Sequence, residues 1–285
     1  MRILVLGASG MLGNAVFRYF SERTEVETFG TLRSAKMLTF FNPSLHRQLL
    51  TAVDVENFDS LSLVFAHIKP DVVINCIGLV KQLALANDPL YALPINAMLP
   101  HRLARLSDMV GARLIHVSTD CVFSGTRGGY SENDFADADD LYGRSKYLGE
   151  VVDCPHVVTL RTSIIGYELS SNQGLVMWFL AQQGTVKGYT KAIFSGVPTV
   201  ELARVIAEFV LPNASLQGLY HVASAPINKY ELLLLLAGQY KKSIDIIPDE
   251  KLVIDRSLNS AKFQAATGYV SPQWSELVAT MCKFG

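Results

Sequence analysis

Three glycines spaced three residues apart, Gly7, Gly10 and Gly13, follow the first apolar run of the chain. At such a junction glycines allow a tight turn, close approach of the backbone to a pyrophosphate, and close packing of helix on strand. The first N–H groups of the helix would face the phosphates. The pattern predicts a strand over residues 3–6, a helix over residues 11–22 and a dinucleotide site formed by Gly7, Ser9, Gly10, Met11, Leu12 and Gly13. The alternative is a packing turn that binds no nucleotide.

Short apolar runs alternate with amphipathic stretches through the first part of the chain. Further strands are predicted over residues 26–29, 71–77, 113–118 and 157–160, with helices over 58–68, 94–109 and 140–152. This alternation predicts an α/β fold with a doubly wound parallel sheet. We expect a dinucleotide-binding domain over residues 1–161, to which residues 192–218 return. A smaller, mainly substrate-binding lobe is expected over residues 162–285, with helices over 175–182, 200–211 and 274–283.

The composition of the chain limits the kinds of partner that we expect it to bind. With 25 Lys and Arg against 26 Asp and Glu, the net charge of -1 gives no broad field for a polyanion, so no nucleic acid is expected. No apolar run approaches the roughly 20 residues that span a bilayer, so no membrane partner is expected. Four cysteines without a C-x-x-C pair indicate a reducing compartment. An apolar run that starts directly after Met1 and Arg2 predicts a cytoplasmic chain. No pair of histidines has the spacing of metal ligands, so no metal is expected.

The segment after the second predicted strand bears on the choice of cofactor. It contains Arg33 and Lys36 but no carboxylate that would hold a ribose 2′-hydroxyl, whereas an arginine suits a 2′-phosphate. NADPH is therefore favoured over NADH as the cofactor, although NADH is also considered. The alternative interpretation of Arg33 and Lys36 is that they belong to a solvated basic loop that binds no cofactor. Asp54 and Val55 are expected near the adenine. At the end of the strand over 71–77, Cys76 and Gly78 are assigned to the cofactor and Lys81 to the substrate.

Tyr142 and Lys146 lie four residues apart, on one face of the helix predicted over residues 140–152. A phenol, whose pKa is ordinarily ~10, can exchange protons at neutral pH when a nearby ammonium stabilises the phenolate. Thr119 ends the strand predicted before this helix, at the sheet edge where ligands of such folds bind, and would offer its hydroxyl to a carbonyl. The alternative interpretation is that Tyr142 and Lys146 are an ordinary pair on one helix face and that the Thr119 hydroxyl only caps the next segment.

Taken together, the motifs are specific. The sequence resembles the extended short-chain dehydrogenases/reductases, and within them the dTDP-4-dehydrorhamnose reductase group, over most of the chain. The resemblance is carried by the glycine turn, Asn96-Ala97, Leu103-Ala104, Ser118-Thr119-Asp120-Cys121-Val122-Phe123-Ser124-Gly125, Tyr142-Gly143-Arg144-Ser145-Lys146, Gly149-Glu150 and Arg161-Thr162-Ser163.

The resemblance implies a Rossmann fold and NADPH-dependent reduction of the C4 keto group of a nucleotide-linked 4-keto-6-deoxy sugar, in the synthesis of polysaccharide precursors. Thr119 would orient the carbonyl, Tyr142 would donate the proton, and Lys146 would bind the ribose and lower the tyrosine pKa. Asn96 would support the site. Asp120, Cys121, Val122 and Phe123 would bind the sugar, and a homodimer is implied as the assembly.

Two departures from the family pattern concern the sugar. Cys121 stands where the family often has an aromatic residue, and residues 76–82 differ from the usual alanine-rich run. Cys121 also stands where the related 4,6-dehydratases carry a glutamate, which disfavours dehydration. An epimerase of the same superfamily is a further alternative, although no histidine lies between His156 and His221. A non-catalytic NADP-binding regulatory subunit, resembling the methionine adenosyltransferase β subunit, is the alternative from another class.

Overall fold

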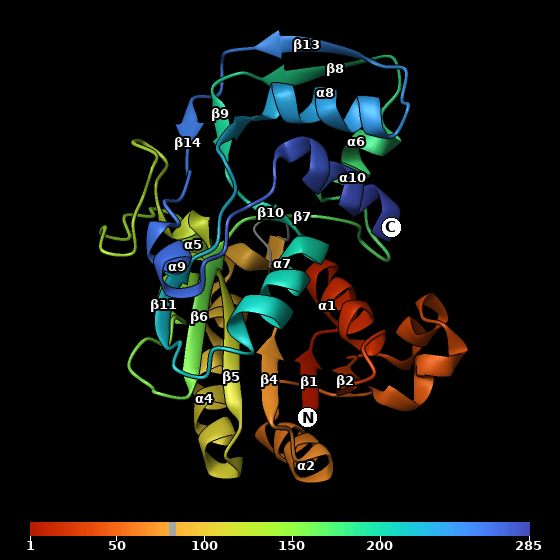
Figure 1. Ribbon diagram of the computed structural model, residues 1–285, viewed down its shortest axis with the longest axis vertical. Helices are drawn as coiled ribbons and strands as arrows, with labels where there is room; N and C mark the ends of the chain where they lie inside the picture. Colours follow the sequence, from red (N-terminus) through yellow and green to blue (C-terminus); the bar gives the residue numbers. More distant parts are fainter. Residues whose placement is uncertain (80–83) are drawn as a thin grey trace. The chain divides into compact units, whose positions relative to one another are not determined.

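The structure of the chain, a computed structural model, describes residues 1–79 and 84–285 (Figure 1). These residues form two compact units with interleaved limits. The first unit holds Met1–Ser118, Asp139–Leu160 and Ser215–Leu219, and the second holds Thr119–Ala138, Arg161–Ala214 and Tyr220–Gly285. The expected domain limit at residue 161 and the expected return of residues 192–218 stay predictions.

A seven-stranded sheet is the main feature of the fold. Its strands are β1 (Arg2–Leu6), β2 (Glu27–Thr31), β3 (Leu49–Leu50), β4 (Val72–Asn75), β5 (Arg113–Thr119), β6 (Val157–Thr162) and β11 (Gly218–His221). They follow one another in the order β11-β6-β5-β4-β1-β2-β3, and Figure 1 shows β5, β4 and β1 side by side. β1 pairs in parallel with β2 and β4, and β4 with β5. Because this is the strand order of doubly wound folds, the predicted fold class is confirmed.

The helices of the first unit are α1 (Met11–Ser21), α2 (Phe58–Ile68), α3 (Pro89–Ala92), α4 (Leu99–Val110) and α5 (Leu141–Leu148), with 3-10 turns at Ala35–Phe40, Pro43–Gln48 and Ala84–Asn87. Local chemistry fixes their ends. The Asn57 side chain accepts hydrogen bonds from the backbone N–H groups of Asp59 and Ser60 and so caps the start of α2. Lys69, which follows the helix, lies in the left-handed region and caps its end. Apolar faces of α2 and α4 then form a core with the sheet, represented by Leu4, Phe65, Leu103 and Leu114.

The structure corrects one predicted helix. Residues 94–109 were expected as a single α-helix, but the chain forms a π-helical turn at Leu93–Met98 before α4 begins at Leu99. Pro94 and Pro100 lie in the first turn of these two elements and lack the N–H group that an uninterrupted α-helix would use. Asn96 lies within this π-turn and is buried, and its contacts are described below.

The second unit contains short strands and five α-helices among its described residues. The strands are β7 (Ile164–Ile165), β8 (Thr185–Tyr189), β9 (Ala192–Phe194), β10 (Val197–Pro198), β12 (Ile227–Asn228), β13 (Asp245–Asp249) and β14 (Ile254–Asp255). The helices are α6 (Leu175–Ala181), α7 (Thr199–Val205), which continues as a π-turn at Ile206–Val210, α8 (Lys229–Gln239), α9 (Ala261–Thr267) and α10 (Trp274–Phe284). β13 runs parallel to β8, as Figure 1 shows.

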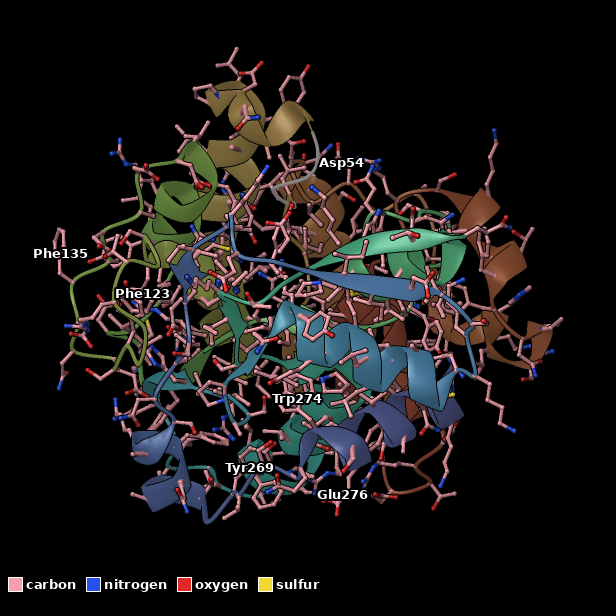
Figure 2. The ribbon with its side chains drawn as sticks, turned by 90° about the horizontal axis from the view of Figure 1, so that it is seen from above. Asp54, Phe123, Phe135, Tyr269, Trp274 and Glu276 are labelled. Atoms are coloured by element: carbon pink, nitrogen blue, oxygen red, sulfur yellow. The ribbon has the colours of Figure 1, made fainter. Side chains whose placement is uncertain are left out.

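Side chains of α10 and of the preceding segment close the core of the second unit. The Trp274 indole donates a hydrogen bond to the Ala225 carbonyl at 2.7 Å, and the Tyr269 hydroxyl donates to the Glu201 carboxylate at 2.9 Å; both rings are buried (Figure 2). Across residues 1–79 and 84–285, no helix combines the length and the apolar character needed to cross a bilayer. The same residues contain no group of three histidine, cysteine, aspartate or glutamate side chains arranged for a metal ion.

Candidate active site

The glycine turn after β1 has the geometry that its spacing predicts. Gly7 has φ +80°, in the region that favours glycine, and its N–H donates to the Thr31 hydroxyl at 3.0 Å. A Cβ atom on Gly13 would lie 2.0 Å from the carbonyl oxygen of Gly7, so no larger residue fits there. The Gly10 N–H donates to the same carbonyl at 3.0 Å and closes the turn.

The start of α1 fits a pyrophosphate. α1 begins at Met11 with Gly10 as its N-cap, and no side chain caps it. Backbone N–H groups of the first helical turn are therefore left for an anion, where the helix dipole adds positive partial charge. Ser9 and Met11 are half-buried beside this turn, whereas Leu12 is buried and packs the helix.

The residues expected near the adenosine half lie at the ends of β2 and β3. Arg33 and Lys36 are exposed after β2. Asp54 is exposed, and its carboxylate accepts a hydrogen bond from the Glu56 N–H at 3.0 Å. Val55 packs against the core cluster of the first unit. The roles of Arg33, Asp54 and Val55 toward a cofactor stay predictions.

The helix α5 carries the tyrosine and lysine pair. The Asp140 carboxylate accepts a hydrogen bond from the Gly143 N–H at 2.7 Å and caps the helix. Lys146 is only 5% exposed, and its ammonium donates to the Val117 carbonyl of β5 at 3.0 Å. Burial lowers the pKa of Lys146 to about 8, while the Glu150 carboxylate and Cys76 act in the opposite direction. Tyr142, one turn earlier, is half-buried.

Cys76 and Gly78, which the sequence assigns to the cofactor, lie beside this lysine. A Cβ atom on Gly78 would lie 3.8 Å from Lys146 Nζ. Burial raises the pKa of the Cys76 thiol to about 12, against the opposing effect of the Lys146 charge. Cys76 is therefore a neutral thiol at physiological pH. Lys81, which the sequence assigns to the substrate, lies outside the described residues.

A buried amide fastens α5 to the loop that contains Gly78. The Asn96 Oδ1 atom accepts a hydrogen bond from the Leu79 N–H at 2.9 Å, and its Nδ2 donates to the Ser145 hydroxyl at 3.2 Å. The Ser145 hydroxyl in turn donates to the Tyr142 carbonyl at 2.9 Å. A Cβ atom on Gly149 would lie 2.0 Å from the Asn96 carbonyl oxygen, so the π-turn and the end of α5 are in close backbone contact. Asn96 thus links the loop that contains Gly78 to α5.

Glu150 was missed by the sequence reasoning as a site residue. Its carboxylate accepts a hydrogen bond from the Ser118 hydroxyl at 2.7 Å, and both side chains are buried. The same carboxylate raises the pKa of Lys146. Glu150 therefore favours the charged form of Lys146. The sequence analysis named Glu150 only as part of the motif Gly149-Glu150 and gave it no role in the site.

The residues predicted to meet the sugar follow β5 in the second unit. The Thr119 hydroxyl accepts a hydrogen bond from the Cys121 N–H at 3.1 Å and donates to the Asp120 carboxylate at 3.2 Å, at the start of the 3-10 turn Asp120–Val122. Burial raises the pKa of Asp120, which Arg256 partly offsets. Val122 and Phe123 are fully buried, in contrast to Phe135, which extends away from its loop in Figure 2. The substrate roles of these residues stay predictions.

Comparisons with known proteins identify the family of the chain. The family model described as the RmlD substrate binding domain matches residues 1–284. The chain belongs to this RmlD family. The resemblance seen in the sequence to the dTDP-4-dehydrorhamnose reductase group is thereby confirmed at the level of the family.

Several relatives of this RmlD-family chain are known. It is 30% identical over 234 residues to the probable low-salt glycan biosynthesis reductase Agl14 of Haloferax volcanii, covering 79% of this chain and 75% of the relative. It is 28% identical over 261 residues to methionine adenosyltransferase 2 subunit beta of Danio rerio, covering 87% and 76%. Its fold matches the dTDP-4-dehydrorhamnose reductase of Bacillus anthracis in complex with NADP, with a TM-score of 0.81, 22% identity and coverage of 100% and 99%.

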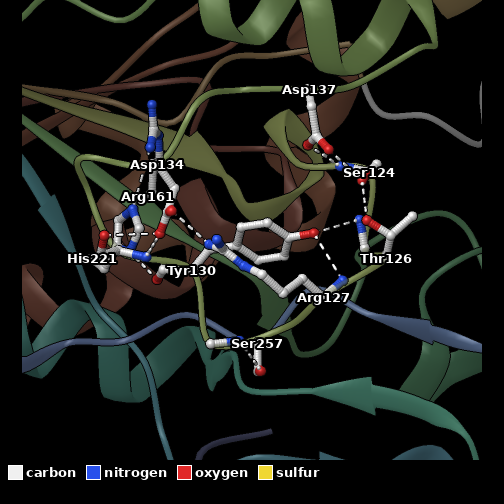
Figure 3. A network of polar contacts seen from close by, with 12 residues as sticks. Ser124, Thr126, Arg127, Tyr130, Asp134, Asp137, Arg161, His221 and Ser257 are labelled. Carbon is white, nitrogen blue, oxygen red and sulfur yellow. Dashed lines mark hydrogen bonds and ion pairs between the residues drawn. The ribbon is translucent and has the colours of Figure 1, made fainter.

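A second polar network of the RmlD-family chain contains Tyr130, Arg161 and His221 (Figure 3). Tyr130 stacks on Phe123 with ring centroids 4.2 Å apart, and the Arg161 guanidinium lies 5.1 Å from the Phe123 ring centroid. Arg161 Nη1 lies 3.3 Å from His221 Nε2, and His221 Nδ1 lies 3.1 Å from the Tyr130 carbonyl. Burial, aided by the Arg161 charge, lowers the pKa of His221 to about 3. His221 is therefore neutral, with its proton on Nδ1, and the network is a structural part of the second unit.

Proposed function

We propose that this protein is an NADPH-dependent reductase of the C4 keto group of a nucleotide-linked sugar, with the 4-keto-6-deoxy sugars as the first class to test. The observation that carries the proposal is the buried ammonium of Lys146, fixed on the Val117 carbonyl and one helical turn from Tyr142. Among residues 1–79 and 84–285, Lys146 forms no ion pair with an acidic side chain. A buried lysine of this kind is costly in a structural role, whereas it suits a proton-transfer site.

The residues assigned to the cofactor would bind the dinucleotide along its length. The turn of Gly7, Gly10 and Gly13 and the start of α1 would hold the pyrophosphate, and Arg33 would contact the 2′-phosphate. Asp54 and Val55 would meet the adenine, and Cys76 and Gly78 would lie beside the nicotinamide half, near Lys146. When bound, NADPH supplies the hydride. NADH stays open as a second cofactor.

The residues of the chain handle the proton. Tyr142 would donate its phenolic proton to the carbonyl oxygen of the sugar. The Thr119 hydroxyl would turn from the Asp120 carboxylate, to which it donates in the structure, and would donate its hydrogen bond to the same oxygen. The charged form of Lys146 would stabilise the phenolate that remains. Because the pKa of Lys146 is about 8, the ammonium is present at neutral pH and is lost as the pH rises above this value.

The substrate side of the proposal rests on the turn after β5. Asp120 and Cys121 would contact the sugar, and Val122 and Phe123 would shape the pocket from the core. Lys81 is assigned to the substrate from the sequence alone. The likeness to a reductase of glycan biosynthesis in Haloferax volcanii supports a role in polysaccharide synthesis. Cytoplasmic location and a homodimer are further parts of the proposal.

The test is an assay of NADPH oxidation with dTDP-, UDP-, GDP- and CDP-linked 4-keto-6-deoxy sugars. Tyr142→Phe should keep its affinity for NADPH and lose about 10²–10⁴-fold in kcat, the range for removal of a general acid. Tyr147→Phe is the matched control, because Tyr147 lies on the same helix and is 45% exposed. Turnover of Tyr142→Phe close to that of Tyr147→Phe would remove Tyr142 from the reaction.

A regulatory role is the second candidate, and the likeness to methionine adenosyltransferase 2 subunit beta favours it. In that case the protein would bind NADPH and a partner protein without reducing any sugar nucleotide. Tight NADPH binding with no oxidation across the whole panel, together with stable binding of a partner protein, would support this candidate over the reductase.

A further inference from the structure

Two fully buried polar residues, Asn75 and His116, lie side by side near the carboxyl ends of β4 and β5. They are partners in the register of the two parallel strands, and Asn75 Nδ2 lies 3.1 Å from His116 Nδ1. Neither residue was assigned to the site from the sequence. Because buried polar groups are costly unless they are hydrogen-bonded, the partners of this pair indicate what it does.

The hydrogen bonds of the pair have one direction. The backbone N–H of Ile77 can only donate, and its nitrogen lies 3.1 Å from Asn75 Oδ1, so this atom is the carbonyl oxygen of the amide. Asn75 Nδ2 then donates to His116 Nδ1, which leaves the ring proton on Nε2. Burial, together with the charges of Lys146 and His101, holds the pKa of His116 well below its ordinary value, so the ring is neutral.

His116 is a costly residue for this position if it only fills space. Its Nε2 atom is buried and has no hydrogen-bond partner within residues 1–79 and 84–285. A buried N–H group without an acceptor is unfavourable, and an apolar side chain would avoid that cost. What an apolar side chain could not supply is the acceptor at Nδ1, and this atom holds the Asn75 amide in one orientation.

The N–H group that Asn75 holds belongs to the loop at residues 76–79. A Cβ atom on Gly7 would lie 2.7 Å from Ile77 Cγ1, so Ile77 packs directly against the glycine turn that follows β1. If the Asn75 amide turned over, its NH₂ group would face the Ile77 N–H, and two donors would repel each other. A displaced Ile77 would then disturb the turn assigned to the pyrophosphate.

The same loop is held at a second point, by the amide of Asn96. The Leu79 N–H donates to Asn96 Oδ1 at 2.9 Å. The exposed Gly78 lies between the two held N–H groups, and a Cβ atom on it would lie 3.8 Å from Lys146 Nζ. Two buried amides therefore fix the loop between the glycine turn and the buried lysine.

We propose that His116 is a positioning residue for the cofactor. Its Nδ1 atom orients the Asn75 amide, and the amide holds Ile77 so that the loop at residues 76–79 and the glycine turn keep the shape that binds the dinucleotide. This inference rests on the proposed function to the extent that the function includes a bound NADPH.

The experiment compares two substitutions that leave nearly the same space. Leucine and asparagine have similar shapes, but only His116→Asn supplies an acceptor oxygen close to the position of Nδ1, whereas His116→Leu does not. The Kd for NADPH is measured by fluorescence, with the urea midpoint as a check on folding. His156→Leu and His156→Asn are the matched controls, because His156 is half-buried in the same unit and contacts the Ala104 carbonyl.

We expect His116→Leu to raise the Kd for NADPH by about tenfold, the loss typical of one hydrogen bond, and His116→Asn to stay within about threefold of the unaltered protein. A role in packing alone predicts equal losses for the two variants, since both leave a similar cavity. Both His156 variants should bind NADPH as the unaltered protein does.

A second measurement tests the proposal on the unaltered protein and does not depend on how the variants fold. NMR of the histidine ring nitrogens reports which nitrogen of each ring carries the proton. We expect His116 to carry its proton on Nε2 at neutral pH, with Nδ1 free to accept. A proton on Nδ1, or a charged ring, would overturn the positioning role.

Equal Kd values for the two His116 variants would also overturn it, as would the same loss in the His156 variants. Failure of the proposed function is recognised separately. If NADPH binds but no keto-sugar nucleotide supports its oxidation, while the His116 variants still differ, the reductase proposal fails and the positioning role stands. If oxidation occurs and the His116 variants bind NADPH alike, only the positioning role fails.

Discussion

Replacing Lys146 with methionine should make the protein more stable at neutral pH while it abolishes turnover. Burial lowers the pKa of Lys146 from 10.5 to about 8, so the folded state carries this charge at a disadvantage. At about 1.36 kcal/mol per pKa unit, the difference corresponds to roughly 3 kcal/mol at pH 7. Loss of the hydrogen bond to the Val117 carbonyl removes about 1 kcal/mol. Lys146→Met should therefore gain about 2 kcal/mol in the free energy of unfolding.

The dependence of this gain on pH distinguishes the explanation from simple repacking. Because the folded pKa is depressed, the unfolded chain binds more protons between pH 8 and 10.5, and the stability of the unaltered protein rises with pH in that window. The advantage of Lys146→Met should shrink over the same range. Urea unfolding at pH 7 and pH 9.5 measures the effect through the midpoint and the m-value, with the exposed Lys251→Met as control. A Lys146→Met protein less stable than the unaltered one at pH 7, or a difference that does not vary with pH, would refute the reasoning.

Three further predictions concern the cofactor and the proton. Gly13→Ala should abolish NADPH binding, measured by fluorescence, because its Cβ would lie 2.0 Å from the Gly7 carbonyl oxygen, whereas Gly238→Ala, with open space around it, should bind normally. Arg33→Ala should raise the Kd for NADPH by about tenfold and leave NADH unchanged, and an equal effect on both would exclude a 2′-phosphate contact. The pH profile of kcat/KM should fall above about 8 as Lys146 loses its proton, and Glu150→Gln should move this fall to lower pH; an unmoved profile would separate Glu150 from the lysine.

The sequence allowed the parts of the site that depend on local spacing to be predicted. The turn of Gly7, Gly10 and Gly13 and the pair of Tyr142 and Lys146 are set by positions a few residues apart on one strand-to-helix junction and one helix. Both lie in the elements expected of them. The strands β1, β2, β4, β5 and β6 were predicted for the same reason, since each begins from a short apolar run of the sequence.

Contacts between distant segments could not be predicted in this way. Glu150 meets Ser118 across 32 residues, and Arg256 meets the Phe123 carbonyl across 133. No local pattern marks such pairs, because the chain topology alone brings them together. The pairing of β8 with β13 was missed for a related reason, since these strands are short and only partly buried, and proline interrupts the second.

The π-turn at Leu93–Met98 constrains the number of residues in its segment more strictly than it constrains which residues they are. A π-turn holds one residue more than a turn of α-helix, and each residue of an α-helix rotates the chain by about 100°. Deletion of a single residue here would leave α4 intact but would swing Asn96 away from Leu79 and Ser145. Insertions and deletions in this stretch should therefore be far less tolerated than substitutions of its outward-facing side chains.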